Sequence, residues 1–506
     1  MRHPSGASET GVDRLSPQTL GRLPAGTRVP RYDRRSLVTG VLHIGVGAFH
    51  RAHQAMYLDQ LLTDGLGDGW AVCGVGLLPG DAAVRDALRP QNGLYTLSVK
   101  APDGSVTRQV LGALADYLYA PDDPEAVVAR LAAPATRILS LTVTEGGYGL
   151  DPATGRFDRA APAVVADLAR TSGWTTVFGL VVEALARRRD AGLEPFTVMS
   201  CDNVEHNGGV AREAFSSYAE ARDPALGRWV RDNVRFPSSM VDRITPATTE
   251  ADQADVQEAT GLLDLAAVVC EPFTQWVLED SFSLGRPAFE QVGVQVVGDV
   301  RPYELMKLRL LNASHQAMAY VGVLSGYRWV HDAAADPLVR ALLAAWMARE
   351  ARPTLPEVRI DLDEYCATLL ERFTNPALGD TLARLAAFSS DRIPGFVLPV
   401  VRDNLAAGRP IEIGAAIVAS WARYAEGVDD HGRPVTVVDQ LAAELVPLAQ
   451  QDDLFAFLAH RPVFGDLVDD ERFRRAYLWA RQSFAAHGAQ ATMADLLART
   501  NAGPSA

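Results

Sequence analysis

The chain has 506 residues, of which 48% are hydrophobic and 22% are charged, and it carries a net charge of −14 at pH 7. This length exceeds what one hydrophobic core serves, so we expect two or three domains of ordinary globular composition. The acidic balance argues against nucleic acid and against an anionic membrane surface as partners.

The sequence shows no pattern typical of secretion or of membrane insertion. Its first residues lack an apolar core, and no apolar run approaches the ~18–20 residues that cross a bilayer. The four cysteines lie far apart, which implies free thiols rather than a disulfide framework. We therefore expect a cytoplasmic protein.

The first 300 residues predict an α/β domain. Residues 1–35 are polar and rich in Pro, Gly and Arg, and we expect a loosely structured arm there. Strand and helix patterns then alternate, which is typical of a Rossmann-like, doubly wound parallel sheet. The predicted strands are 41–47, 70–77, 137–144 and 196–201, and the predicted helices are about 50–63 and 177–189.

The character of the sequence changes near residue 300, where helical patterns begin to dominate. We therefore place an N-terminal domain at 1–299 and a mainly α-helical C-terminal domain at 300–506. The clearest helical spans are 302–322, 337–350, 362–372, 413–425 and the tail after Asp470.

A glycine pattern follows the first predicted strand and opens the first predicted helix. Gly45-Val-Gly-Ala-Phe-His50 has the first two glycines of the G-x-G-x-x-G fingerprint, with His50 in the third place. Such glycines let the backbone approach a pyrophosphate at a helix N-terminus. A purely structural turn is the alternative. The residues expected to contact the cofactor here are Ile44, Gly45, Val46, Gly47, Ala48, Phe49, His50 and Arg51.

An acidic residue after the second predicted strand bears on the choice of cofactor. Asp81 follows the second predicted strand, where an acid would accept hydrogen bonds from the ribose and repel a 2′-phosphate, so we expect NAD rather than NADP. A loop aspartate without a ligand is the alternative.

His50 and His53 lie one helical turn apart, but no carboxylate or cysteine at ligand spacing joins them, and we therefore expect no metal.

Lysine is rare in this chain, since only Lys100 and Lys307 occur among 48 basic residues. A lysine can lose its proton when it is desolvated, which an arginine in effect cannot do. Lys100 stands before a turn and is interpreted as a surface charge. Lys307 stands in a helical stretch, and we expect it to act as a general base.

Polar residues share one side of the helix predicted at 302–322. At 100° per residue, Glu304, Lys307, Asn312 and His315 fall within a sector of about 140°. A solvated face is the alternative, but leucines are interleaved in the same sector. Alcohol oxidation needs a base and donors for the developing alkoxide, so we assign the base to Lys307 and the donors to Asn312 and to Asn203, which ends a predicted strand.

The residue types alone leave the roles of His315 and Glu304 less determined. His315 could bond a substrate hydroxyl. Glu304 could either relay protons to solvent or pair with an arginine.

Several motifs together resemble the polyol-specific long-chain dehydrogenases of the mannitol dehydrogenase family. The resemblance covers nearly all of the chain after the arm. The motifs are His43-Ile-Gly-Val-Gly-Ala-Phe-His-Arg-Ala-His-Gln-Ala, Thr144-Glu-Gly-Gly-Tyr, Ser200-Cys-Asp-Asn, Phe236-Pro-Ser-Ser-Met-Val-Asp-Arg, Glu271-Pro-Phe-Thr-Gln-Trp, and Lys307 with Asn312 and His315 at the family's spacing.

The resemblance implies a role for each matching residue. Lys307 is then the general base, Asn203 and Asn312 form the oxyanion hole, and His315 contacts the substrate. Asp242 lies near the substrate, and Glu304 gates a proton path. Glu145, in the second motif, is assigned to cofactor binding. The family needs no metal.

One segment departs from the family pattern. The family has an Arg followed by Asp-Gly-Ser and a Lys, whereas this chain has Arg384 followed by Phe388-Ser-Ser-Asp-Arg392. A guanidinium is larger and flatter than an ammonium. We expect Arg384 and Arg392 to bind substrate, and the pair would also suit a carboxylate.

These observations favour one reaction and leave alternatives. We expect NAD-dependent oxidation of a secondary hydroxyl of an open-chain polyol to the ketose, with D-mannitol and D-fructose as the leading pair. D-Arabinitol, sorbitol, or reduction of fructuronate or tagaturonate are alternatives. A nucleotide-sensing regulator is the non-enzyme alternative. We expect a monomer or a small homo-oligomer.

Overall fold

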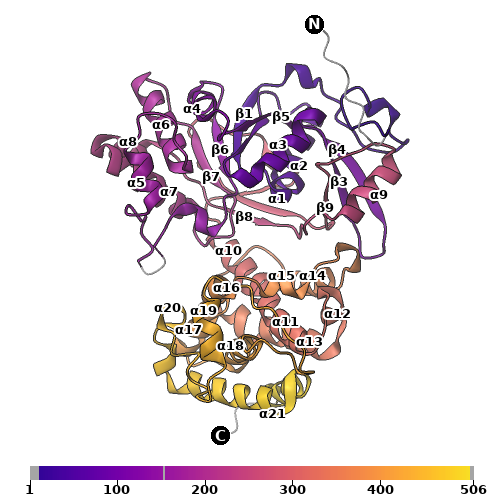
Figure 1. The fold of residues 1–506 in the computed structure, drawn as a ribbon, viewed down its shortest axis with the longest axis vertical. Helices are drawn as coiled ribbons and strands as arrows, with labels where there is room; N and C mark the ends of the chain where they lie inside the picture. The colour runs from indigo at the N-terminus through magenta and orange to yellow at the C-terminus, as the bar shows by residue number, and fades with distance from the viewer. Residues whose placement is uncertain (1–10, 152–153, 502–506) are drawn as a thin grey trace. The chain divides into compact units, whose positions relative to one another are not determined.

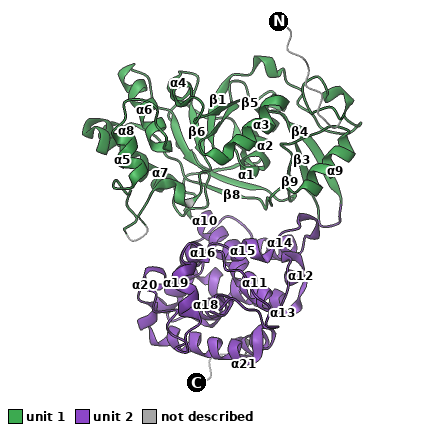
Figure 2. Ribbon diagram, in the orientation of Figure 1, with its two compact units in different colours: residues 1–101, 105–301 green, residues 102–104, 302–506 purple. Residues whose placement is uncertain are grey.

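The computed structural model describes residues 11–151 and 154–501. The chain divides into two compact units, residues 1–101 with 105–301 and residues 102–104 with 302–506 (Figure 2). All the strands of the described residues lie in the first unit, and the described part of the second is mainly helical. The predicted fold class is confirmed.

A five-stranded parallel sheet forms the centre of the first unit (Figure 1). The chain runs outward from β1 through β2 to β5 on one side, then returns to build β6 and β7 on the other side. The strand order therefore reverses between β1 and β6, which is where such sheets open a ligand crevice beyond the carboxyl ends. In sheet order the strands are β5 (Leu114–Tyr119), β2 (Ala71–Gly76), β1 (Thr39–Ile44), β6 (Ile138–Leu141) and β7 (Thr197–Ser200).

The central strands are covered on both faces, which explains their continuous apolar runs. Leu42 and Leu139 pack with helices on one face, whereas Val41 and Ile138 belong to a separate apolar cluster on the other. The helices of the first unit are α1 (Ala48–Ala52), α2 (Gln54–Thr63), α3 (Ala82–Leu88), α4 (Pro124–Ala132), α5 (Pro162–Leu168), α6 (Val177–Asp190), α7 (Asn207–Arg222), α8 (Pro224–Asn233) and α9 (Glu250–Thr260).

Two small sheets complete the first unit. The sequence patterns indicated a strand that ends at Lys100 but predicted neither sheet. One has the order β11-β10-β8 and the other the order β4-β3-β9. Their short strands contribute Trp276, Leu97 and Val268 to the same apolar cluster as Val41. The bounds are β8 (Ser239–Asp242), β10 (Gln275–Glu279) and β11 (Gln295–Val297), and β3 (Tyr95–Lys100), β4 (Val106–Leu111) and β9 (Val268–Cys270).

The arm expected to be loosely structured is held against the first unit from residue 11 onward. Leu15 is 1% exposed and packs in a small apolar cluster with Leu94 and Val110. Tyr32 donates a hydrogen bond to Asp59 of α2. The arm has little regular structure, with 3-10 turns η1 (Leu20–Arg22) and η2 (Arg34–Ser36), yet tertiary contacts fix it. Residues 1–10 lie outside the described residues.

The second unit is a bundle of helices around one large apolar core. Its predicted helices are confirmed, but the span 302–322 is not one regular helix: a π-helical segment, η7 (Leu308–Asn312), separates α10 (Arg301–Lys307) from α11 (Ala313–Leu324). A second π-helical segment, η8 (Trp346–Ala351), follows α13. The remaining helices are α12 (Val330–Ala335), α13 (Pro337–Ala345), α14 (Leu362–Phe373), α15 (Leu382–Ala386), α16 (Ser389–Phe396), α17 (Leu398–Ala406), α18 (Glu412–Tyr424), α19 (Ala442–Ala449), α20 (Arg461–Phe464) and α21 (Glu471–Asn501).

Candidate active site

The predicted site residues fall into two groups, one in each unit. The first group follows the carboxyl ends of β1, β2, β6 and β7 and of the neighbouring β8. The second group lies on the interrupted helix α10–η7–α11 and on α15 and α16.

Gly45 and Gly47 shape the loop after β1. Gly45 has φ +93°, and a Cβ there would lie 2.0 Å from the Thr142 carbonyl oxygen, so only glycine fits. At Gly47, which precedes α1, the nearest heavy atom to a Cβ is 3.9 Å away. The first glycine thus brings two strand ends together, and the second leaves open space beside the amide groups at the start of α1.

The helix predicted at about 50–63 is helical over that span but is divided into α1, which ends at Ala52, and α2, which ends at Thr63 as predicted. The break falls at His53, with φ −121° and ψ −88°. The His53 ring bonds the carbonyl of Gln275 at 2.8 Å and packs edge-on against Trp276. These contacts with β10 outweigh the local helical preference of the sequence.

His50 occupies the third-glycine position as a buried support for the loop. Its ring stacks on His43 at 3.5 Å between centroids. His43 bonds Ser140 at 2.7 Å and Thr142 at 3.0 Å. Burial lowers the pKa of His43 to about 3 and that of His50 well below its usual value, so both rings are neutral. Among the described residues, no group of three or more His, Cys, Asp or Glu side chains is placed to hold a metal ion.

Arg51 and Asp81 both have structural partners. The Arg51 guanidinium donates to the carbonyl of Ala266 and lies 5.7 Å from the centre of the Tyr95 ring. These contacts orient the buried Arg51 side chain toward the protein interior. Asp81 accepts hydrogen bonds from the main-chain N–H groups of residues 77 and 78, each at 2.8 Å and each on Oδ2. Within the described chain Oδ1 accepts no hydrogen bond, so it is available to a ribose hydroxyl.

Asp202 ties together the loops that follow β6 and β7. Its carboxylate accepts hydrogen bonds from the N–H groups of Val143 at 3.1 Å and Thr144 at 2.9 Å, and from the Tyr148 hydroxyl at 2.7 Å. Thr144 has φ +67°, an uncommon conformation for a threonine that these bonds hold in place. Glu145 starts the short helix η5 (Glu145–Tyr148), and its side chain lies outside the part that the structure describes.

Asn203 and Asp242 end the first group. Asn203 directly follows Asp202 and is exposed. The Asn207 side chain donates to the carbonyls of Asp202 at 3.0 Å and Ser239 at 2.7 Å, so it links this loop to the start of β8. Asp242 ends β8 and is 3% exposed.

The second group centres on the π-helical segment η7. Glu304, Lys307 and Asn312 are buried and His315 is partly exposed. At 100° per residue, Lys307 and Asn312 mark the two edges of the predicted sector, about 140° apart. Asn312 is the last of the five residues of the π-helix, whose i→i+5 bonding makes each residue turn by less than 100°. The sector is therefore narrower than the sequence suggested.

Positive charges surround His315. Burial is the largest cause that lowers its pKa well below the usual value, followed by the charges of Arg384, Arg372, Lys307 and Arg392. Its ring lies 4.7 Å from that of Phe373. The imidazole is therefore neutral and can both donate and accept a hydrogen bond.

Arg384 and Arg392 are fixed differently. Arg384 makes a two-pronged ion pair with Asp380, with Nε donating to Oδ1 at 2.6 Å. Arg392 donates to the carbonyls of Leu385 at 2.8 Å and of Arg384 at 3.2 Å. The Arg392 guanidinium is thus tied to the main chain of α15, whereas Asp380 balances the charge of Arg384.

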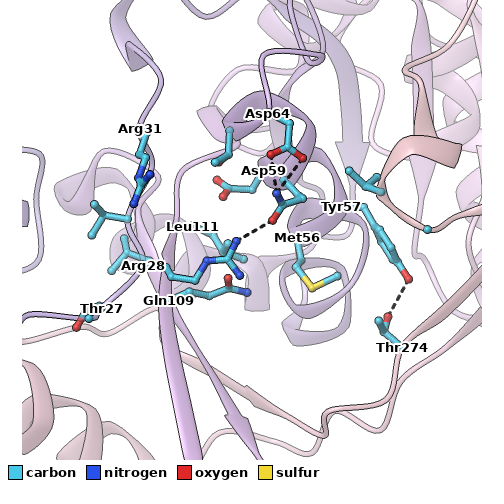
Figure 3. Close-up of a pocket in the computed structure, with 17 residues that line it drawn as sticks. Thr27, Arg28, Arg31, Met56, Tyr57, Asp59, Asp64, Gln109, Leu111 and Thr274 are labelled. Atoms are coloured by element: carbon cyan, nitrogen blue, oxygen red, sulfur yellow. Dashed lines mark hydrogen bonds between the residues drawn. The ribbon is translucent and has the colours of Figure 1, made fainter.

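A cavity of about 760 Å³ in the first unit is separate from these residues (Figure 3). The arm, α2 and β4 line it. Several of its polar groups bond one another: Arg28 donates to Gln60 at 3.0 Å, Gln60 donates to Asp64 at 2.9 Å, and Tyr57 pairs with Thr274 at 3.2 Å. None of the predicted site residues is among its lining residues.

Two family models match the two halves of the chain. A mannitol dehydrogenase Rossmann domain matches residues 39–291, and a mannitol dehydrogenase C-terminal domain matches residues 299–482. The chain belongs to the mannitol dehydrogenase family. The resemblance read from the motifs is thereby confirmed.

Relatives match this mannitol dehydrogenase family chain over almost its whole length. A mannitol 2-dehydrogenase of Aspergillus fumigatus is 43% identical over 494 residues, which cover 95% of this chain and 98% of the relative. The structure of Pseudomonas fluorescens mannitol 2-dehydrogenase with NAD and D-mannitol is 42% identical, with a TM-score of 0.90 over 96% of this chain and 100% of that one. A D-sorbitol dehydrogenase in substrate-free form is 40% identical, with a TM-score of 0.85 over 95% and 100%.

Sequence reasoning missed two supporting residues of this mannitol dehydrogenase family chain. His43 and Asp202 make the hydrogen bonds that fix the loops after β1, β6 and β7. Both belong to the family motifs given above, and a polar residue at the end of an apolar strand is the pattern that could have identified them.

No helix among the described residues is long and apolar enough to span a membrane.

Proposed function

We propose that this protein is an NAD-dependent oxidoreductase that oxidises a secondary hydroxyl of an open-chain polyol to the ketose, with D-mannitol to D-fructose as the leading pair. The observation that carries the proposal is the set of polar residues Lys307, Asn312 and His315 on a buried helix. The similarity to the P. fluorescens enzyme, solved with NAD and D-mannitol, supports it.

The first unit offers a fitting place for the dinucleotide. Gly45 and Gly47 leave the loop after β1 open beside the N-terminal amides of α1, and Asp81 follows the neighbouring strand β2. These residues lie beside the point where the strand order reverses. The bound nicotinamide would supply the hydride acceptor. Asp81 would bond the ribose, which favours NAD over NADP.

Lys307 would take the proton from the reacting hydroxyl. A lysine accepts a proton only as the neutral amine, and burial and nearby positive charge are the general conditions that favour this form. Lys307 is 5% exposed. Its charge and the charges of three arginines lie close enough to His315 to lower the pKa of that histidine.

Two amides and an imidazole would serve the substrate oxygens. The amide N–H groups of Asn312 and Asn203 would donate to the oxygen on which negative charge develops. His315, which is neutral, would bond a neighbouring hydroxyl of the polyol. Asp242 would contact the substrate, and Glu304 would pass the proton onward. No metal is assigned a role.

The substrate within this class has two leading candidates. The D-sorbitol dehydrogenase, at 40% identity, is almost as similar as the mannitol enzyme at 42%, so sorbitol is the second candidate. The ion pair between Arg384 and Asp380 disfavours a uronate, since it leaves less charge for a substrate carboxylate. We also propose a cytoplasmic enzyme that works as a monomer or a small homo-oligomer, and its free cysteines are consistent with that compartment.

The test is a substrate panel with the purified protein. NAD-linked oxidation of D-mannitol, sorbitol and D-arabinitol is compared with NADH-linked reduction of fructuronate and tagaturonate, and each assay is repeated with the phosphorylated cofactor. We expect the highest kcat/KM with D-mannitol and NAD. A protein that binds NAD but turns over no member of the panel would support the nucleotide-sensing alternative.

A further inference from the structure

We infer that Trp346 is a positioning residue that sets the angle between Lys307 and Asn312 by holding the π-helical segment η7. This inference rests on the proposed function. Trp346 lies 39 residues further along the chain than Lys307 and belongs to none of the motifs that identified the site. It acts through the backbone of η7.

The contact that carries the inference is a single buried hydrogen bond. The Trp346 side chain is 0% exposed, and its Nε1–H donates to the main-chain carbonyl of Arg309 at 3.0 Å. Arg309 is the second residue of η7. Its guanidinium donates to Asp403 at 2.6 Å and to the carbonyl of Thr354 at 3.0 Å. Both the backbone and the side chain of this π-helical residue are therefore tied to neighbouring segments.

The π-helical winding decides which residues face the same way. The N–H of Ala313 bonds the carbonyl of Leu308, five residues back, instead of a carbonyl four residues back. If this extra residue were absorbed into regular α-helix, Asn312 and His315 would rotate by roughly 100° relative to Lys307. Lys307 and Asn312 would then lie about 140° apart, at the two edges of the polar sector, instead of close together on one side of the helix.

A π-helical segment is rare and needs support from outside its own helix. A carbonyl has two lone pairs, so the Arg309 oxygen can accept the indole N–H in addition to a bond within the helix. Removal of the indole donor leaves this buried carbonyl with one partner fewer. The equilibrium between π-helical and α-helical winding of η7 then shifts toward regular α-helix.

The indole is itself carried by a rigid element. Trp346 begins the second π-helical segment η8, whose Glu350 carbonyl accepts a hydrogen bond from Asn404 at 2.9 Å. The Glu350 carboxyl accepts from the N–H groups of Ile413 at 2.7 Å and Gly414 at 2.8 Å, at the start of α18. The donor thus has a fixed position, which is what a positioning residue needs.

The experiment removes the indole N–H and compares two buried tryptophans. Trp346→Phe is paired with Trp421→Phe, because Trp421 is also buried in the second unit but packs on the Phe457 and Phe464 rings instead of η7. A further variant carries 3-benzothienylalanine at position 346, an isostere in which sulfur replaces the N–H group. It keeps the shape of tryptophan if Trp346→Phe fails to fold.

We expect kcat for polyol oxidation to fall by roughly 10- to 100-fold in both position-346 variants, because small displacements of catalytic groups have effects of this size. The pH profile of kcat should move as well. The Kd for NAD should stay within about 2-fold of the native value. Amide hydrogen exchange in residues 308–313 should be faster in these variants than in Trp421→Phe at matched thermal stability.

Two results would overturn the inference, and they differ from each other. If native protein oxidises polyols and the benzothienylalanine variant keeps the native kcat, pH profile and exchange rates, Trp346 does not position the site and the proposed function stands. If native protein oxidises no polyol, the proposed function fails and the positioning role fails with it.

Discussion

Lys307 is the side chain on which the chemistry of the site depends. It is buried on a helix that also presents Asn312 and His315. Replacement by alanine removes the proposed base, and Lys307→Arg substitutes a group that does not give up its proton. We expect both variants to lose about 10²- to 10⁴-fold in kcat while the Kd for NAD is unchanged, as measured by steady-state kinetics and cofactor titration.

The chain offers a natural control for this experiment. Lys100 is the other lysine, and its largely buried side chain forms an ion pair with Asp252 in the first unit. Lys100→Ala should keep the native kcat. Undiminished turnover in Lys307→Ala would remove this residue from the role of base.

The two asparagines can be tested in the same assay. Asn203→Ala and Asn312→Ala should each lower kcat by about 10²-fold if their amides donate to the developing oxyanion. Asn233→Ala serves as the control, because its side chain bonds the carbonyl of Trp229 within α8. A variant that retains the native rate would exclude that asparagine from the oxyanion hole.

Asp81 governs the choice of cofactor in the proposed site. Without its carboxylate the ribose loses an acceptor and a 2′-phosphate loses a repelling charge. Asp81→Ala should therefore raise the ratio of kcat/KM for NADP to that for NAD by roughly 10-fold. The control is Asp86→Ala, since Asp86 is paired with Arg85 on α3. An unchanged ratio would assign Asp81 to loop structure alone.

At the scale of single elements, Glu350 links the second π-helical segment to the start of α18. Burial raises the pKa of its carboxyl from 4.5 to about 8, against the opposing effect of two main-chain hydrogen bonds. The folded protein therefore holds this proton more tightly than the unfolded chain does. This group lowers the free energy of unfolding progressively as the pH rises from about 4.5 to 8, and no further above that.

Glu350→Gln should abolish this pH dependence. The variant is destabilised at every pH, because the amide oxygen accepts only one of the two N–H groups at α18. The difference in the free energy of unfolding between the native protein and the variant, which we call the gap, should narrow as the pH rises from 4.5 to 8. Thermal midpoints across this range measure the gap. The control is Glu371→Gln on the exposed side of α14. A gap that stays constant with pH would contradict the raised pKa.

The regular elements were predictable, and the irregular ones were not. Apolar runs such as 41–47 predicted the central strands because those strands are buried on both faces. The break at His53 depends on contacts with β10, and η7 depends on a tryptophan far along the chain. Single-segment periodicity contains no information about such partners, so it predicted two continuous helices.

At the scale of the whole molecule, the reaction should need no metal ion. The proposed base and oxyanion donors are side chains of the protein itself. Prolonged treatment with a chelator should leave kcat unchanged, measured before and after dialysis with and without added zinc. Activity that is lost on chelation and restored by zinc would contradict this.

The site was predictable to the extent that its residues stand in local motifs. Gly45 and Asn203 could be proposed as site residues because each stands at the carboxyl end of a predicted strand of a parallel sheet. The ion pair between Arg384 and Asp380 could not, because nothing in the spacing says which acid faces which arginine. The same applies to the hydrogen bonds of Asp202, which join segments 58 residues apart.

The anchored arm has a practical consequence for anyone who shortens this protein. A version that starts directly at β1 would lack Leu15, which packs on Leu94 and Val110. It would also lack Tyr32, whose hydroxyl donates a hydrogen bond to Asp59. Apolar side chains of the first unit would then face water, and the Asp59 carboxylate would keep the N–H donor of Gly112 but lose its hydroxyl donor. A shortened version should therefore keep the chain from residue 11 onward.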